Sequence, residues 1–158
     1  MLSVTIPGLG PLNIQYVVSD LNGTLSMNGE INPKLPAKIN ALKAIGITFY
    51  VLSADTRGKL HELATQLGAI PHILTFQGKE STEKAEFIIK LGAENVVAIG
   101  NGNNDYLMLK AAKIGIAVLG KEGLSIKALL NSDICVSSPE EALDLLLNPI
   151  NLLSSLRD

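Results

Sequence analysis

The chain has 158 residues, a formal net charge of −2, 47% hydrophobic residues and a single cysteine. This length suits one domain with its own core, and no apolar run reaches the roughly 18–20 residues that a membrane-spanning helix needs. The lack of tryptophan and of any basic run argues against nucleic-acid binding. We therefore expect neither a nucleic-acid nor a membrane partner, and the lone cysteine predicts a cytoplasmic location.

The N-terminal segment, residues 2–16, predicts a β-hairpin, because two short apolar stretches flank a turn rich in glycine and proline. A first central strand follows over residues 16–20, and after Leu25 the chain reads as a short polar flap. Helical and strand patterns then alternate regularly. The predicted helices cover 33–45, 55–67, 82–91, 105–112, 122–130 and 139–147, and the predicted strands cover 47–53, 72–76, 95–100, 114–119 and 134–137.

This alternation predicts an α/β fold whose doubly wound, mostly parallel sheet has helices on both faces. We divide the single domain 1–158 into the hairpin, a core over 17–147 and a C-terminal tail over 148–158. The apolar positions of the tail predict a short helix that docks on the domain or on a partner. Ser138 is expected to be the N-cap of the last core helix.

The first central strand runs directly into the sequence Asp20-Leu21-Asn22-Gly23-Thr24-Leu25. A carboxylate at the C-terminal end of a buried parallel strand lies where open α/β sheets bind ligands, and Asn-Gly lets the chain leave the strand sharply. A simple strand-terminal turn explains the same residues about equally well. The functional interpretation makes Asp20 a nucleophile toward phosphorus.

Two further motifs follow the same pattern. The next strand ends in Ser53-Ala54-Asp55, where the Ser53 hydroxyl is suited to hold a phosphoryl oxygen and Asp55 is expected to cap the following helix. A crowded phosphoryl site also needs a cation to offset its negative charge. Lys84 and Lys79 are the candidates, and the spacing to the fourth motif favours Lys84.

The fourth motif is Gly100-Asn101-Gly102-Asn103-Asn104-Asp105, at the end of the strand predicted over 95–100. Its glycines allow close approach of the backbone. A plain strand-to-helix turn with Asp105 as N-cap is the simpler alternative. The two glycines around an asparagine, followed by a run of amides and a carboxylate, favour a functional loop.

Together these motifs resemble the haloacid dehalogenase (HAD) superfamily of phosphotransferases, and most closely its capless, soluble P-type-ATPase-like proteins. The first resembles the D-x-[DT]-G-T-L nucleophile loop, the second the T-G-D motif, and the fourth the G-D-G-x-N-D loop. The resemblance implies a Rossmann-like sheet, Mg²⁺ as cofactor and an aspartyl-phosphate on Asp20. Ordinary βα units fill the segments where superfamily members insert a cap, so we expect no cap domain.

The resemblance also implies three sets of site residues. The catalytic set is Asp20, Asn22, Ser53 and Lys84. The phosphate-binding set is Asp20, Leu21, Asn22, Ser53, Ala54, Lys84 and Asn104. The metal set is Asp20, the main-chain carbonyl of Asn22, Asn101, and Asp105 directly or through water.

Two residues depart from the phosphatase pattern, in which most members have aspartate at the position of Asn22 and the fourth motif has aspartate at the position of Asn101. Asn22 cannot protonate a leaving oxygen or activate water, and such general acid–base help is worth roughly 10²–10⁴-fold in rate. We therefore expect weak turnover of alkyl phosphates. Asn101 removes a negative charge beside the metal, which predicts weaker Mg²⁺ binding.

Both departures leave open a non-catalytic regulatory domain that binds phosphate or metal. A receiver-like phosphoacceptor is a weaker alternative, because receivers carry the phosphorylated aspartate in the middle of the chain. The sequence predicts a phosphorylated substrate without naming it. A homo-oligomer is a further possibility, with residues 2–16 and the tail as interface elements unless they pack on their own domain.

Overall fold

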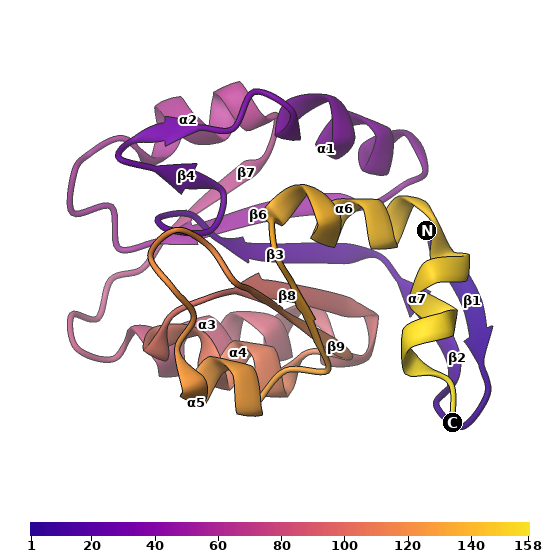
Figure 1. Cartoon of the computed structure of the whole chain (residues 1–158). Helices are drawn as coiled ribbons and strands as arrows, with labels where there is room; N and C mark the ends of the chain where they lie inside the picture. The colour runs from indigo at the N-terminus through magenta and orange to yellow at the C-terminus, as the bar shows by residue number, and fades with distance from the viewer.

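The computed structural model describes all 158 residues and is built around a six-stranded sheet with the order β10-β9-β8-β3-β6-β7 (Figure 1). Every neighbouring pair in this sheet is parallel. Its strands are β3 (Tyr16–Asp20), β6 (Thr48–Ser53), β7 (Ile70–Ile73), β8 (Val96–Gly100), β9 (Ile114–Val118) and β10 (Ile134–Val136). The predicted doubly wound α/β fold is confirmed.

Helices cover both faces of the sheet (Figure 1). One face carries α1 (Leu35–Ala44), α2 (Leu60–Leu67) and α6 (Pro139–Leu147), and the other carries α3 (Glu80–Leu91), α4 (Tyr106–Ala111) and α5 (Ile126–Leu130). Single turns, η1 (Ala93–Asn95) and η2 (Asn103–Asp105), flank β8. The buried strands are apolar on both sides, as expected for a covered parallel sheet. None of the helices combines the length and the hydropathy required to traverse a bilayer.

The N-terminal hairpin and the C-terminal tail lie together at the end of the sheet where β3 begins (Figure 1). The hairpin consists of β1 (Leu2–Ile6) and β2 (Gly10–Ile14), and the tail forms α7 (Pro149–Leu156). Leu2, Ile14 and Leu152 are buried in the main hydrophobic core. The hairpin and the tail therefore pack on their own domain.

A two-stranded flap, β4 (Ser26–Met27) and β5 (Glu30–Ile31), follows β3. Asn28 and Gly29 both have positive φ angles, of 54° and 82°, as a two-residue hairpin turn requires. Only this flap and α1 lie between β3 and β6, and only α2 and β7 lie between β6 and α3. No cap domain is inserted at either place, as predicted.

Two helices begin four or five residues later than the sequence pattern suggested. Helix α2 begins at Leu60 rather than at residue 55, because Asp55 adopts a left-handed conformation with φ of 52°. The Asp55 carboxylate accepts a hydrogen bond from the Leu60 amide at 2.8 Å, but the N-cap of α2 is Lys59, so the prediction that Asp55 itself caps the helix is wrong. Helix α5 begins at residue 126 rather than 122, because Gly123 closes a turn and Ser125 caps the helix.

The edges of the sheet account for two other differences. Strand β7 covers residues 70–73 rather than 72–76, and it contains Pro71 because an edge strand tolerates a missing amide donor. Cys135, whose strand position predicts burial, is exposed because β10 is the other edge strand. Ser138 does cap α6, accepting a hydrogen bond from the Glu141 amide at 3.2 Å.

Candidate active site

Polar residues gather where three neighbouring strands end. Asp20 is the last residue of β3, Ser53 is the last residue of β6, and Asn101 directly follows β8. The three strands are adjacent, with β3 in the middle. Because the carboxyl ends of parallel strands meet at one edge of a sheet, Asp20 lies at the centre of the group.

Lys84 is the cation of the site. It comes from the first half of α3, is 1% exposed, and its Nζ lies 2.6 Å from Asp20 Oδ1 and 2.7 Å from Asp105 Oδ1. The other oxygen of Asp105 accepts hydrogen bonds from the main-chain amides of Asn101 and Gly102, both at 2.9 Å. Lys79, the alternative candidate, is exposed at the N-terminus of α3.

The network contains two carboxylates and one ammonium group, and this imbalance shifts the pKa values of its members. Burial and the neighbouring Asp105 raise the pKa of Asp20 from 3.8 to about 6, although Lys84 acts in the opposite direction. Burial alone would lower the pKa of Lys84, but the two carboxylates outweigh it and raise that pKa. Lys84 therefore stays protonated, and Asp20 binds a proton more readily than an exposed aspartate.

The loop after Asp20 is held in a tight turn. Gly23 has a φ angle of 77°, and the amides of Thr24, Leu25 and Ser26 all lie within 3.3 Å of the Leu21 carbonyl oxygen. The Leu21 side chain is buried in the core, so only its main chain belongs to the site. This turn brings Asn22 to the surface above Asp20.

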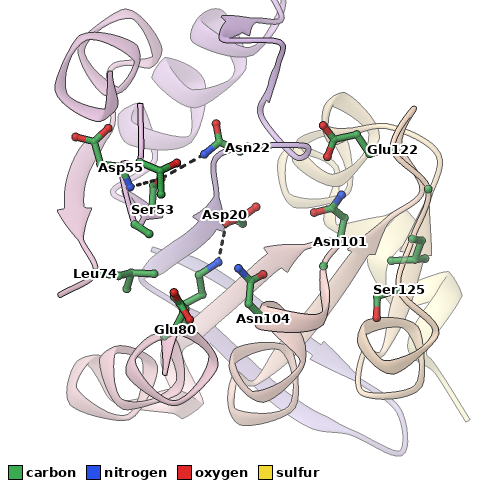
Figure 2. A pocket seen from close by; sticks show the side chains of 16 residues that line it. Asp20, Asn22, Ser53, Asp55, Leu74, Glu80, Asn101, Asn104, Glu122 and Ser125 are labelled. Carbon is green, nitrogen blue, oxygen red and sulfur yellow. Dashed lines mark hydrogen bonds and ion pairs between the residues drawn. The ribbon is translucent and has the colours of Figure 1, made fainter. Parts of the chain in front are cut away.

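Asn22 and Ser53 face each other across the site. Asn22 Nδ2 donates a hydrogen bond of 3.4 Å to Ser53 Oγ, which also accepts one of 3.0 Å from the Asp55 amide (Figure 2). The main-chain carbonyl of Asn22 accepts no hydrogen bond. That oxygen is therefore available to a ligand or a cation.

A polar cavity of about 730 Å³ opens over these groups. Of the predicted site residues, those that line it are Asp20, Asn22, Ser53, Ala54, Lys84, Asn101 and Asn104. Asp105 does not line it, because its fully buried carboxylate lies behind Lys84 and is bonded through both oxygens. In this structure Asp105 holds Lys84 and the loop after β8.

Sequence reasoning missed two residues of the site. Thr24 Oγ1 lies 3.4 Å from Asp20 Oδ2 and 3.2 Å from Asn101 Oδ1, so its single proton can be donated to either. The position of Thr24, directly after the Asn-Gly turn, was the available signal. Glu122 lines the cavity from the loop after β9, and the helix wrongly predicted from residue 122 concealed its place at a strand end.

The oxygen atoms around Asp20 suit Mg²⁺. No three Asp, Glu, His or Cys side chains are grouped so that they could hold an ion by themselves, so a cation here would also need main-chain or amide oxygens. Asp20, the free carbonyl of Asn22 and the Asn101 amide offer carboxylate, carbonyl and amide oxygens. Mg²⁺ accepts such oxygen ligands and keeps several waters besides.

Comparison with known structures shows the same fold. The crystal structure of 3-deoxy-D-manno-octulosonate 8-phosphate phosphatase from Moraxella catarrhalis, in complex with magnesium ion, phosphate ion and KDO, superposes with a TM-score of 0.71. It is 21% identical in sequence, and the match covers 90% of each chain.

Sequence comparison adds two relatives from Methanocaldococcus jannaschii. An uncharacterized protein is 47% identical over 85 residues, which cover 51% of this chain and 91% of that protein. A soluble P-type ATPase-like phosphatase is 22% identical over 142 residues, covering 89% of this chain but only about half, 52%, of the relative. The family model for haloacid dehalogenase-like hydrolases matches residues 9–113. The chain belongs to the haloacid dehalogenase-like hydrolase family.

Proposed function

We propose that this chain is a Mg²⁺-dependent phosphatase that works through an aspartyl-phosphate on Asp20. The observation that carries the proposal is the position of Asp20, which lies between a buried lysine and an open polar cavity. Lys84 engages Oδ1, while Oδ2 meets only the hydroxyl of Thr24 at 3.4 Å. Oδ2 is thus the oxygen free to attack a phosphorylated substrate in the cavity.

In the proposed reaction, Asp20 Oδ2 attacks phosphorus while the bond from phosphorus to the leaving oxygen breaks. This step gives an acyl phosphate on Asp20 and releases the leaving group. Water then attacks the same phosphorus, which frees inorganic phosphate and restores the Asp20 carboxylate. Lys84 offsets the negative charge, and Ser53 and Asn104 hold phosphoryl oxygens, because positioning and charge stabilisation provide most of the catalysis in such transfers.

The residues proposed to hold Mg²⁺ are Asp20, the Asn22 carbonyl and Asn101. For Asp105 we propose the water-mediated role, because both of its oxygens are already bonded. When bound, the ion would supply positive charge to the phosphoryl oxygens and reduce repulsion between them and Asp20. The protein's part is to fix these oxygens at one end of the sheet.

Asn22 limits which substrates turn over well. Its amide lines the cavity and donates a hydrogen bond to Ser53, but an amide is too weak an acid to transfer a proton to a leaving oxygen. Phosphates whose leaving groups need no protonation, such as aryl and acyl phosphates, should therefore react faster than alkyl phosphates.

The proposal is tested by trapping the intermediate. The chain is incubated with acetyl phosphate and Mg²⁺, quenched in acid and analysed by peptide mass spectrometry, with Asp20→Asn as the control. We expect a phosphoryl adduct on Asp20 in the wild-type protein and none in the variant.

A non-catalytic phosphate- and metal-binding domain is the second candidate, favoured by asparagine at both positions 22 and 101 in the cavity. The trapping experiment on Asp20 also distinguishes this binding domain from a phosphatase. Mg²⁺ binding measured by calorimetry, together with no adduct on Asp20, would establish the binding domain instead of the phosphatase.

A further inference from the structure

A carboxylate from outside the four motifs faces the active-site cavity. Glu122 lies in the loop between β9 and α5, and its side chain points into the pocket close to that of Asn101 (Figure 2). A Cβ atom placed on Gly23 would collide with the Glu122 carboxylate and lie 3.0 Å from Asn101 Nδ2. Glu122 and Asn101 therefore converge on one point, which only a glycine in the nucleophile loop leaves open.

The loop that carries Glu122 is fixed to the rest of the site by main-chain contacts. The Gly123 amide donates to the Gly120 carbonyl at 3.0 Å, and the Ser125 amide donates to the Asn101 carbonyl at 2.9 Å. A Cβ atom on Gly120 would lie 3.3 Å from the Gly23 carbonyl oxygen. The main chain on both sides of Glu122 is consequently held against the nucleophile loop and the loop after β8, while the Glu122 side chain itself is exposed.

Glu122 is also the one carboxylate lining the cavity that has no partner. Asp20 is paired with Lys84, Asp55 accepts a hydrogen bond from the Leu60 amide at 2.8 Å, and Glu80 accepts one from the Gly78 amide at 3.1 Å. Glu122 forms no hydrogen bond and no ion pair. Its full negative charge is thus available to a cation in the cavity.

This charge lies where the site otherwise lacks one. Asn101 is neutral, and the buried carboxylate of Asp105 is used up by Lys84 and two amides. Asp20 alone would then balance a divalent ion while it shares its other oxygen with Lys84. A second carboxylate beside Asn101 would restore the missing charge.

We propose that Glu122 supplies the second negative charge of the Mg²⁺ site, in place of the side chain at position 101. Because no three acidic side chains are grouped around one point, Glu122 would act on a bound ion through water and not as a direct ligand. Mg²⁺ keeps several such waters in proteins. This inference rests on the proposed function, and it assigns a role to a residue outside the motif set.

The test measures Mg²⁺ affinity directly by isothermal titration calorimetry, without any substrate. Glu122→Gln should weaken Mg²⁺ binding by about 10-fold or more, the usual effect of removing a carboxylate that orients a metal's surroundings. Glu86→Gln, which removes the same charge from an exposed position on α3, should bind Mg²⁺ as the wild type does. Thermal melts without metal confirm that each variant is folded.

A double variant makes the test specific. Adding Asn101→Asp to Glu122→Gln should restore most of the lost affinity, because it returns a carboxylate to the same corner of the cavity. Equal affinity of Glu122→Gln and wild type, or the same loss in Glu86→Gln, would overturn the role of Glu122 and leave the proposed phosphatase intact. A wild-type protein that binds no Mg²⁺ would overturn the proposed function itself.

Discussion

A single ammonium group between two carboxylates organises the active site. Breaking such a buried set is costly, because desolvated charges are tolerated only when they are paired. Lys84 therefore does two things: it stabilises the ends of the sheet, and it leaves one oxygen of Asp20 free toward the cavity. The chemistry that follows depends on the residues around that oxygen.

Restoring a carboxyl group at position 22 should restore the missing acid. We expect Asn22→Asp to raise kcat on a sugar phosphate by about 10²-fold or more, the range of general acid–base help. Turnover of p-nitrophenyl phosphate, whose leaving group needs no proton, should change far less. Steady-state kinetics of Asn22→Asp and the wild type on both substrates measure these changes in kcat. An equal gain on the sugar phosphate and on p-nitrophenyl phosphate would contradict the role assigned to Asn22.

The raised pKa of Asp20 predicts an acid limb in the rate profile. An acid whose pKa is raised to about 6 ionises only at higher pH, so transfer to Asp20 should fall as the pH drops through about 6 at low Mg²⁺. A nearby cation favours the ionised form. The limb of kcat/KM should then move to lower pH at saturating Mg²⁺. A limb that stays in place would mean that the ion does not contact Asp20.

At the scale of the elements, α3 matters because it places Lys84 in the buried charge network, while Lys79 at its N-terminus stays exposed. Lys84→Met keeps most of the side-chain bulk but leaves Asp20 and Asp105 without their cation. We expect a loss of about 3–5 kcal/mol in the free energy of unfolding, measured by urea denaturation.

The control residue is Lys79, the N-cap that directly precedes α3. Lys79→Met, at the exposed N-terminus of α3, should change the free energy of unfolding by about 0.5 kcal/mol or less. Similar losses in both variants would show that Lys84 acts through the helix alone and not through the buried carboxylates.

Alternation of strands and helices was predictable along the chain, because each pattern repeats over several residues. The starts of α2 and α5 were not, since they depend on the left-handed residues Asp55 and Gly123. Those two loops border the active-site cavity. The local error at α5 is also the reason why Glu122 was missed.

At the scale of the whole molecule, the hairpin and α7 close the end of the core opposite the active site (Figure 1). Leu152 is fully buried there, while Ile150 on the same helix is 78% exposed. Leu152→Ala should cost about 2–5 kcal/mol in the free energy of unfolding. Ile150→Ala should cost about 0.5 kcal/mol or less, and thermal or urea unfolding compares them.

Equal effects of Leu152→Ala and Ile150→Ala would show that α7 does not dock as described.

Self-association and a cytoplasmic location stay predictions. Four apolar residues of the hairpin, Leu2, Ile6, Leu12 and Ile14, are buried in its own domain. Sedimentation analysis would show whether the chain self-associates.

The sequence by itself determined the family, the fold class and most side chains of the site, because each motif is short and directly follows a strand. Asp20, Ser53 and Asn101 could be placed together from the rule that parallel strands end at one edge. The tertiary structure alone decided between Lys84 and Lys79, showed that both oxygens of Asp105 are engaged, and placed Glu122 on the same cavity as Asn101. These facts depend on distances between loops far apart in the chain, which no local pattern encodes.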